Sequence, residues 1–301
     1  MNNNTLKTNC LLVIVMLLWS SSLVLSKFLF SFYHPIILIS IRMLISLACF
    51  VFFFKEIRSV KYQKNDWKLI LLVSICEPCL FFILESQALV YSTANQIGMV
   101  TSIGPIITII IAMFLLGEKN LTRQNYFGII ISTIGVIALL QNSKQAGDNA
   151  INPVLGNFLE LGALICGAVY SVGFKILSKR YSVITLTFFQ MLIGSVFFCL
   201  LAFMLGKTSI SLNLQGLLGV LYLGVFVSFG SYIIFNLMIS QNKVSNVVPY
   251  LNLVPLFTVL MSYYALQETI NINQCYACLV IMVGIFFSQR KKKEEKETVE
   301  V

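Results

Sequence analysis

The chain has 301 residues, of which 58% are hydrophobic and only 11% are charged, and its mean hydropathy is +0.87. A soluble globule of this size needs far more polar surface, so the composition indicates an integral membrane protein. The net charge of +9 would suit a nucleic-acid partner, but the distribution of the basic residues follows a membrane topology instead. We therefore expect the lipid bilayer as a partner and no nucleic acid.

Ten apolar segments follow one another along the chain, each close to the length of about 20 residues that crosses a hydrocarbon core. They lie at about 8–26, 35–54, 69–90, 93–116, 124–141, 153–174, 183–205, 214–238, 244–266 and 273–289. The first is similar to the apolar part of a signal peptide, but no small-residue cleavage site follows, so we expect a retained helix. The predicted fold class is all-α integral membrane with ten transmembrane helices.

The positive charges predict the orientation of these helices. If the N-terminus is cytoplasmic, the segments on that side carry 17 lysine and arginine residues, whereas the opposite side carries Lys27, Lys144 and Lys207. Such a bias places both termini in the cytoplasm of a multi-pass protein of the cell membrane. The remaining basic residue, Arg42, lies within the second segment.

The chain repeats itself. "PIITIIIAMFLLGEK", which begins at Pro105, returns 150 positions later as "PLFTVLMSYYALQET", and Glu118 becomes Glu268. "YHPIILISIRMLI" and "YSVITLTFFQMLI" match at an offset of 148. Each copy holds five helices, so the second enters the membrane from the opposite side, which predicts two inverted repeats with the site between them.

The expected domains follow from this repeat. They are a first five-helix repeat over 1–141, an extracytoplasmic linker over 142–152, a second repeat over 153–289 and a charged cytoplasmic tail over 290–301.

Several motifs resemble those of the EamA-type branch of the drug/metabolite transporter superfamily. They are "WSSSLVLSK", "PIILISIR" and the block of Pro105, Gly117, Glu118, Gln124, Gly128 and Gly135. The second copy departs from the pattern, with Cys166 in place of the tryptophan, Gln190 in place of the arginine and "LQET" in place of "LGE". The resemblance implies a ten-helix secondary carrier that exports small metabolites, often amino acids or amphipathic compounds. It also implies a central cavity lined by helices one to four and six to nine.

Four ionisable residues fall within the predicted spans, and all should face the protein interior because a charge facing lipid is costly. Arg42 and Glu85 either serve transport, by holding an anionic group or taking up a proton, or form a structural ion pair. Glu77 precedes Pro78, which should bend the helix, and is either a proton site or a neutral, hydrogen-bonded acid. For Glu160 we favour a carboxylate that reaches toward the membrane interface.

For further polar residues the sequence leaves two interpretations open, a role in transport or a role in packing. Trp19, beside three serines, either lines a cavity or marks close helix contact, and Lys27 is expected to be an interfacial anchor. The same choice, cavity wall or polar contact between helices, applies to a larger group, which is Asn95, Ser102, Asn252, Tyr250, Asn236 and Tyr170.

The repeated motif itself is interpreted as structural. Pro105 and Pro255 should loosen the fourth helix of each copy beside the cavity. Glu118 should cap the start of the segment that follows it, and Glu268 repeats that position. We therefore place these four residues in a hinge.

Other function classes find less support. A membrane-embedded enzyme is disfavoured because the H-E-x-x-H motif is absent and no aspartate lies within a predicted span. The two C-x-x-C pairs lie at different depths with no histidine near, so we expect neither a metal nor a cofactor. A passive channel or a membrane accessory subunit is the alternative to a transporter. Proton coupling and a homodimer, through a small-residue face at Gly128, Ser132 and Gly135, are further expectations.

Overall fold

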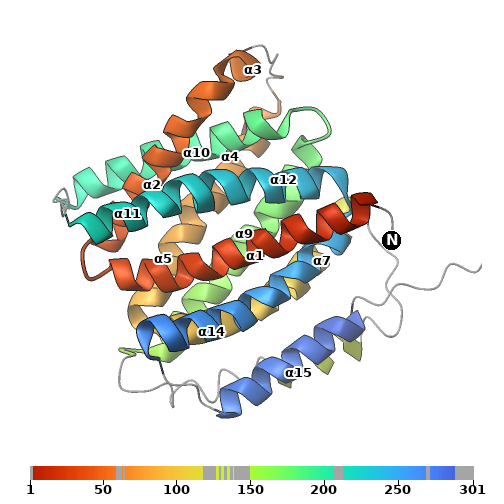
Figure 1. Ribbon diagram of the computed structural model, residues 1–301. Coiled ribbons are helices and arrows are strands. Elements are labelled where there is room, and N and C mark those ends of the chain that lie inside the picture. The colour runs from red at the N-terminus through yellow and green to blue at the C-terminus, as the bar shows by residue number, and fades with distance from the viewer. Residues whose placement is uncertain are drawn as a thin grey trace, which may run out of the picture.

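The computed structural model describes residues 3–58, 63, 65–117, 150–206, 213–268 and 272–288, with scattered positions between 127 and 138. Within these residues all regular elements are helices, packed as one bundle (Figure 1). The first copy contributes α1 (Asn3–Leu29), α2 (Pro35–Cys49), η1 (Phe50–Phe53), α3 (Phe54–Arg58), α4 (Trp67–Ser74), η2 (Ile75–Leu80), α5 (Phe81–Tyr91), α6 (Ala94–Val100), η3 (Thr101–Ile103) and α7 (Gly104–Leu116). The second contributes α9 (Pro153–Leu177), α10 (Val183–Met204), α11 (Leu214–Tyr222), η5 (Leu223–Ser231), α12 (Tyr232–Gln241), α13 (Val244–Val247), η6 (Val248–Asn252), α14 (Leu253–Leu266) and α15 (Ile272–Ser288).

Eight of the ten expected spans are helical stretches long and apolar enough to cross a bilayer in the described part of the chain. They are Leu6–Leu29, Pro35–Arg58, Trp67–Tyr91, Ala94–Leu116, Pro153–Leu177, Val183–Met204, Leu214–Gln241 and Val244–Leu266. The fifth expected segment, 124–141, is described only at scattered positions. The tenth is α15, whose apolar stretch Cys275–Gly284 is shorter than a full span.

The two copies interrupt their helices at equivalent places. The third span of each contains a π-type turn, η2 or η5, and the fourth contains a 3₁₀ stretch, η3 or η6, just before Pro105 or Pro255. At η2 the backbone of Glu77 leaves the helical region, with φ −145° and ψ 118°, before Pro78. The predicted bend at Pro78 is therefore confirmed, whereas the loosening of both fourth helices stays a prediction.

Equivalent residues also end the two fourth spans. Gly117 follows α7 with φ 68°, a left-handed conformation that suits glycine. Its counterpart after α14 is Gln267, which adopts the same conformation with φ 53° although its side chain disfavours it. The second copy therefore has the same backbone geometry at this position, although it has glutamine in place of glycine.

The copies interlock through exchanged contacts. α1 packs on α14, and in return α9 packs on α7, while α2 and its counterpart α10 pack on each other (Figure 1). α6 also crosses α14 closely, because a Cβ added at Gly98 would lie 2.6 Å from Thr258 Cβ. Such an exchange is expected of two copies related by a pseudo-two-fold axis.

The bundle has two ends, the Lys27 end and the Lys175 end. The Lys27 end contains the end of α1 and the turn between α5 and α6, and the Lys175 end contains the end of α9 and the turn between α12 and α13. At the Lys175 end, Asp66 before α4 accepts hydrogen bonds from Arg180 at 2.7 Å and from the Tyr181 hydroxyl at 2.8 Å. The pKa of Asp66 is lowered, first by the Tyr181 hydrogen bond and then by Arg180. This contact joins the two copies at that end.

The small-residue face proposed for a dimer is partly used within the chain. A Cβ at Gly135 would lie 2.7 Å from Ile281 and 3.1 Å from the carbonyl oxygen of Ala277, both in α15. Gly135 therefore packs against a helix of the same chain, and it does not leave an open surface for a second subunit.

Candidate functional site

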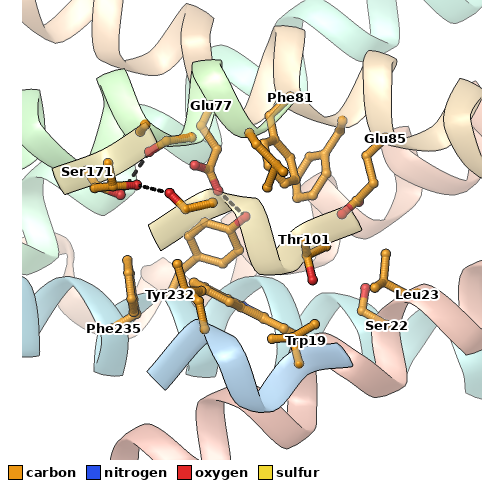
Figure 2. Close-up of a pocket in the computed structure, with 18 of the residues that line it drawn as sticks. Trp19, Ser22, Leu23, Glu77, Phe81, Glu85, Thr101, Ser171, Tyr232 and Phe235 are labelled. Atoms are coloured by element: carbon orange, nitrogen blue, oxygen red, sulfur yellow. Dashed lines mark hydrogen bonds between the residues drawn. The ribbon is translucent and has the colours of Figure 1, made fainter. Parts of the chain in front are cut away.

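A central cavity lies between the two copies, and the space within it, including the part that is open to solvent, amounts to about 760 Å³. Both copies contribute to it, from α1, α2, η2, α5, η3 and α7 on one side and from α9, α12, η6 and α14 on the other. Its polar wall consists of Ser22, Arg42, Glu77, Glu85, Thr101, Thr108 and Ser171. Aromatic rings form much of the rest, namely Trp19, Phe81, Phe82, Tyr232 and Phe235 (Figure 2).

Trp19 forms an aromatic wall of this cavity. Its ring centroid lies 5.6 Å from that of Tyr232 and 4.7 Å from that of Phe235, and its Nε1–H donates to Ser231 Oγ at 2.7 Å. The neighbouring Ser20 packs instead, because its hydroxyl lies 3.1 Å from the carbonyl oxygen of Val254 in the other copy. In this segment of α1, Trp19 therefore lines the cavity, whereas Ser20 contributes to close contact between helices.

Arg42 enters the cavity from α2 and is only 4% exposed. Its Nε–H donates to Ser228 Oγ at 2.5 Å, and its guanidinium carbon lies 4.4 Å from the centroid of the Phe82 ring. Within the described residues it forms no ion pair, although Glu77 and Glu85 are near enough to interact with it electrostatically. The remaining N–H groups of the guanidinium are thus free to bind an anionic group.

Glu77 is held at the bend in the third span. The Tyr232 hydroxyl donates to its carboxylate across the two copies, as the dashed line in Figure 2 shows. Gly167 of α9 lies against the same side chain, since a Cβ there would be 3.5 Å from Glu77 Oε2. The backbone distortion therefore aims a buried acid at the centre of the bundle, where Tyr232 holds it.

The other two acids differ from each other. Glu85, on α5, is half-buried and points into the cavity (Figure 2). Glu160, on α9, is 0% exposed, and neither carboxylate oxygen has a hydrogen-bond partner among the described residues. Our expectation that Glu160 reaches toward the interface is wrong, because the side chain is fully buried on a helix against which α5, α6 and α7 pack.

Six predicted site residues lie outside the cavity wall, namely Asn95, Ser102, Asn252, Tyr250, Tyr170 and Asn236. Asn95 and Ser102 are buried between helices, and the Ser102 hydroxyl donates to the carbonyl of Met99 at 2.5 Å. Asn252 lies in η6, and the Tyr250 hydroxyl donates to Asn9 Oδ1 at 2.7 Å. The Ser102 bond thus stays within its own segment, whereas the Tyr250 bond joins η6 to α1.

Tyr170 and Asn236 form a buried network at the Lys175 side of the cavity. The Tyr170 hydroxyl lies 2.6 Å from Asn236 Oδ1 and 3.0 Å from Gln190 Oε1, and Asn236 Nδ2 donates to Thr187 Oγ1 at 3.0 Å. All four side chains are at most 1% exposed. They fill space between α9, α10 and α12.

Lys27 and Lys175 play equivalent parts at the two ends. Lys27 Nζ donates to the carbonyls of Leu89 and Ser92, at 2.5 and 2.7 Å, at the end of α5. Lys175, which matches Lys27 at the offset of 148, donates to carbonyls at the end of α12. Instead of only anchoring at the interface, Lys27 caps a helix whose C-terminal end carries partial negative charge.

Glu268 completes the corner at the Lys27 end. Its two carboxylate oxygens accept the backbone N–H groups of Ala94, at 2.9 Å, and Asn95, at 2.7 Å, at the start of α6. The capped helix belongs to the other copy and does not follow Glu268 in sequence. Glu118, its counterpart, lies outside the described residues.

Sequence reasoning missed most of the aromatic wall, including Phe81, Phe82, Tyr232 and Phe235. The chain has 24 phenylalanines, and aromatic residues occur on lipid-facing and interior faces alike. One signal was present for Tyr232 and Phe235, since they match Phe82 and Glu85 at the offset of 150.

The fold and the cavity define a multi-pass membrane protein with two copies of one helical unit around a central cavity. The chain belongs to the EamA-like transporter family, whose model matches residues 6–141 and 154–289, one match for each copy. It is a transporter and not an enzyme. The family suggested by the sequence motifs is thereby confirmed.

Relatives extend over nearly the whole chain. An uncharacterized transporter of Bacillus subtilis (strain 168), YvbV, is 25% identical over 292 residues, which cover 96% of this chain and 94% of the relative. An uncharacterized transporter of Archaeoglobus fulgidus is 24% identical and covers 96% and 99% of the two chains. A solved crystal structure with 17% identity aligns over 94% of this chain and 96% of its own, with a TM-score of 0.69, which supports the fold.

Proposed function

We propose that this protein is a secondary transporter of the cell membrane that exports a small amphipathic metabolite, such as an amino acid, by alternating access. The observation that carries this proposal is the composition of the cavity between the copies. Aromatic rings offer an apolar surface, while Arg42, Glu77 and Glu85 offer charge at the same site. Such a wall suits a solute with one apolar part and one charged part.

Contacts that must break during the transport cycle lie at both ends. At the Lys27 end, Glu268 joins the second copy to α6 of the first. At the Lys175 end, Asp66 joins the first copy to Arg180 of the second. We infer that rocking of the copies opens one of these contacts at a time, so that the cavity faces one side of the membrane and then the other. The distribution of basic residues supports a cytoplasmic Lys175 end.

The acids of the cavity support proton coupling as part of the proposal. A buried carboxyl group can exchange a proton when the cavity opens to water, and binding of a charged solute beside it changes the cost of ionisation. Glu77 and Glu85 both lie on the wall that a solute would touch. Coupling would then show as flux that depends on a pH gradient.

The test uses purified protein in proteoliposomes and counterflow of a panel of labelled amino acids. We expect saturable flux that falls more than tenfold in Arg42→Ala, with unchanged expression, because the solute loses its cationic partner. Arg58→Ala is the matched control, since Arg58 is an exposed arginine at the end of α3. Flux that does not saturate would favour a passive channel, and flux that requires another protein would favour an accessory subunit.

A further inference from the structure

A second, smaller cavity lies beside the central one, toward the Lys27 end. It lies between α1, α2 and α5, and the space between its wall atoms, including any that is open to solvent, amounts to about 270 Å³. Arg42, Phe82 and Glu85 line both cavities, so these three side chains form the partition between them. Ser26 and Ser86 add hydroxyl groups to the smaller space.

The partition contains two charged groups, Arg42 and Glu85, that are not paired with each other. Arg42 and Glu85 form no ion pair within the part of the chain that the structure describes, and Glu85 has no hydrogen bond there. Only one N–H of the Arg42 guanidinium is used, by Ser228. A buried charge is costly unless it is paired, and Arg42 is only 4% exposed. A ligand with a carboxylate for Arg42 and an ammonium group for Glu85 would complete both.

The equivalent space in the second copy is filled. Ser26 corresponds to Phe174 and Arg42 to Gln190 at the offset of 148, and Ser86 corresponds to Asn236 at the offset of 150. Phe174 and Gln190 are each 1% exposed, and Asn236 is 0% exposed and bonded to Tyr170. The same architecture therefore holds a cavity near the Lys27 end and a packed, hydrogen-bonded plug near the Lys175 end.

The Lys27 contact lies next to the smaller cavity. Leu89 lines this cavity, and its carbonyl accepts a hydrogen bond from Lys27, which also binds the carbonyl of Ser92. Release of Lys27 would free the end of α5 from α1. The cavity would then open at that end of the bundle.

We propose that the smaller cavity is a second binding station, for the zwitterionic end of a solute, on a path that leaves the bundle between α1, α2 and α5. The proposal rests on the transport function proposed above and adds the route and the head-group chemistry. The apolar part of the solute stays in the aromatic cavity while its carboxylate and ammonium groups contact Arg42 and Glu85. Movement of Phe82 with these two residues then passes the head group toward the Lys27 end.

The first test measures access to the smaller cavity without measuring transport. A cysteine is introduced by Ser86→Cys, and its reaction with the neutral reagent 2-hydroxyethyl methanethiosulfonate is followed by peptide mass spectrometry at that position. Ser26→Phe, which installs the residue of the second copy, should slow the reaction at least tenfold by filling the cavity. Ser31→Phe adds the same bulk at an exposed position near the end of α1 and should leave the rate unchanged. Lys27→Gln should raise the rate several-fold.

The second test addresses the head group with three probes that share one apolar body. L-Phenylalanine should slow the reaction of Ser86→Cys more than 3-phenylpropionate, which lacks the ammonium group, or phenylalaninamide, which lacks the carboxylate. Equal protection by all three, or by none, would overturn the assignment of a zwitterionic head group. Arg42→Ala should remove the preference.

The outcomes separate the two proposals. Equal reaction rates in the Ser26→Phe and Ser31→Phe backgrounds, or no reaction even in Lys27→Gln, would overturn the path. Saturable flux that Ser26→Phe leaves intact would overturn it as well. Absence of flux in the unmodified protein, together with the expected pattern of cysteine reaction and protection, would support the binding station and refute the transport function.

Discussion

The contact between Glu268 and the start of α6 gives a prediction that can be worked from the structure. Glu268 is 6% exposed, and its carboxylate accepts the N–H groups of Ala94 and Asn95 at 2.9 and 2.7 Å. A hydrogen bond to a charged group contributes about 1.5–3 kcal/mol, so two such bonds set an upper bound of about 3–6 kcal/mol. Water that enters the truncated site lowers the loss expected for Glu268→Ala to about 2–4 kcal/mol.

Hydrogen exchange at the two amides is the direct assay. Each 1.36 kcal/mol corresponds to a factor of ten, so a loss of 2–4 kcal/mol should speed exchange of the Ala94 and Asn95 amides by about 30- to 900-fold. Glu268→Gln keeps one acceptor oxygen but no charge, and its effect should lie between those of the native chain and Glu268→Ala. The expected local change would also favour separation of the copies at the Lys27 end.

The control for this prediction is Gln267→Ala. Gln267 is the exposed neighbour of Glu268. Its side-chain amide donates only to the carbonyl of Tyr264, at 3.1 Å, among the described residues. Its replacement should leave exchange at Ala94 and Asn95 unchanged. Unchanged exchange in Glu268→Ala would refute the assignment of Glu268 as the cap of α6, and an equal effect in Gln267→Ala would show a general loosening of that end.

Three further predictions concern stability in detergent. Tyr232→Phe should lower the free energy of unfolding by about 1–3 kcal/mol, because the buried Glu77 carboxylate loses its donor; unchanged denaturant unfolding would contradict this. The pKa of Asp66 is lower in the folded state, so its contribution is complete above the unfolded pKa of about 4 and is lost as the pH falls through the folded pKa. The stability gap between the native chain and Asp66→Asn should therefore close in acid, and a gap independent of pH would refute the linkage. Gln267→Gly should raise the melting temperature, with a gain of about 0.5–1 kcal/mol, by relieving a left-handed conformation, and an unchanged or lower melting temperature would contradict this.

Much of the fold could be predicted because membrane burial imposes length and polarity on each helix. The apolar segments predicted the helices, and the offsets of 148 and 150 predicted the two copies. The cost of a charge in lipid predicted that Arg42, Glu77 and Glu85 lie in the interior. These three residues and Trp19 do lie at the cavity. The proline beside Glu77 gave the bend for the same reason, since its effect on the backbone is local.

Other features depend on which helix lies opposite, and local patterns do not report this. Asn95 and Ser102 precede the repeated proline, as a cavity residue would, but they are buried and do not line the cavity. Glu268 caps a helix of the other copy, although a cap is normally sought in the adjoining segment. The match between Lys27 and Lys175 was present in the repeat, yet their carbonyl partners become visible only when the ends of α5 and α12 are placed.

Alternating access of the two copies around the cavity is tested most directly by locking one end. Asp66 and Arg180, which join the copies at the Lys175 end with their side chains 2.7 Å apart, are both replaced by cysteine and bridged with a short bis-methanethiosulfonate reagent. The bridged protein should lose more than nine-tenths of its saturable flux in proteoliposomes, still bind the transported solute, and recover flux when the bridge is reduced, whereas the unmodified chain treated alike should be unaffected. Undiminished flux through the bridged protein would contradict alternating access.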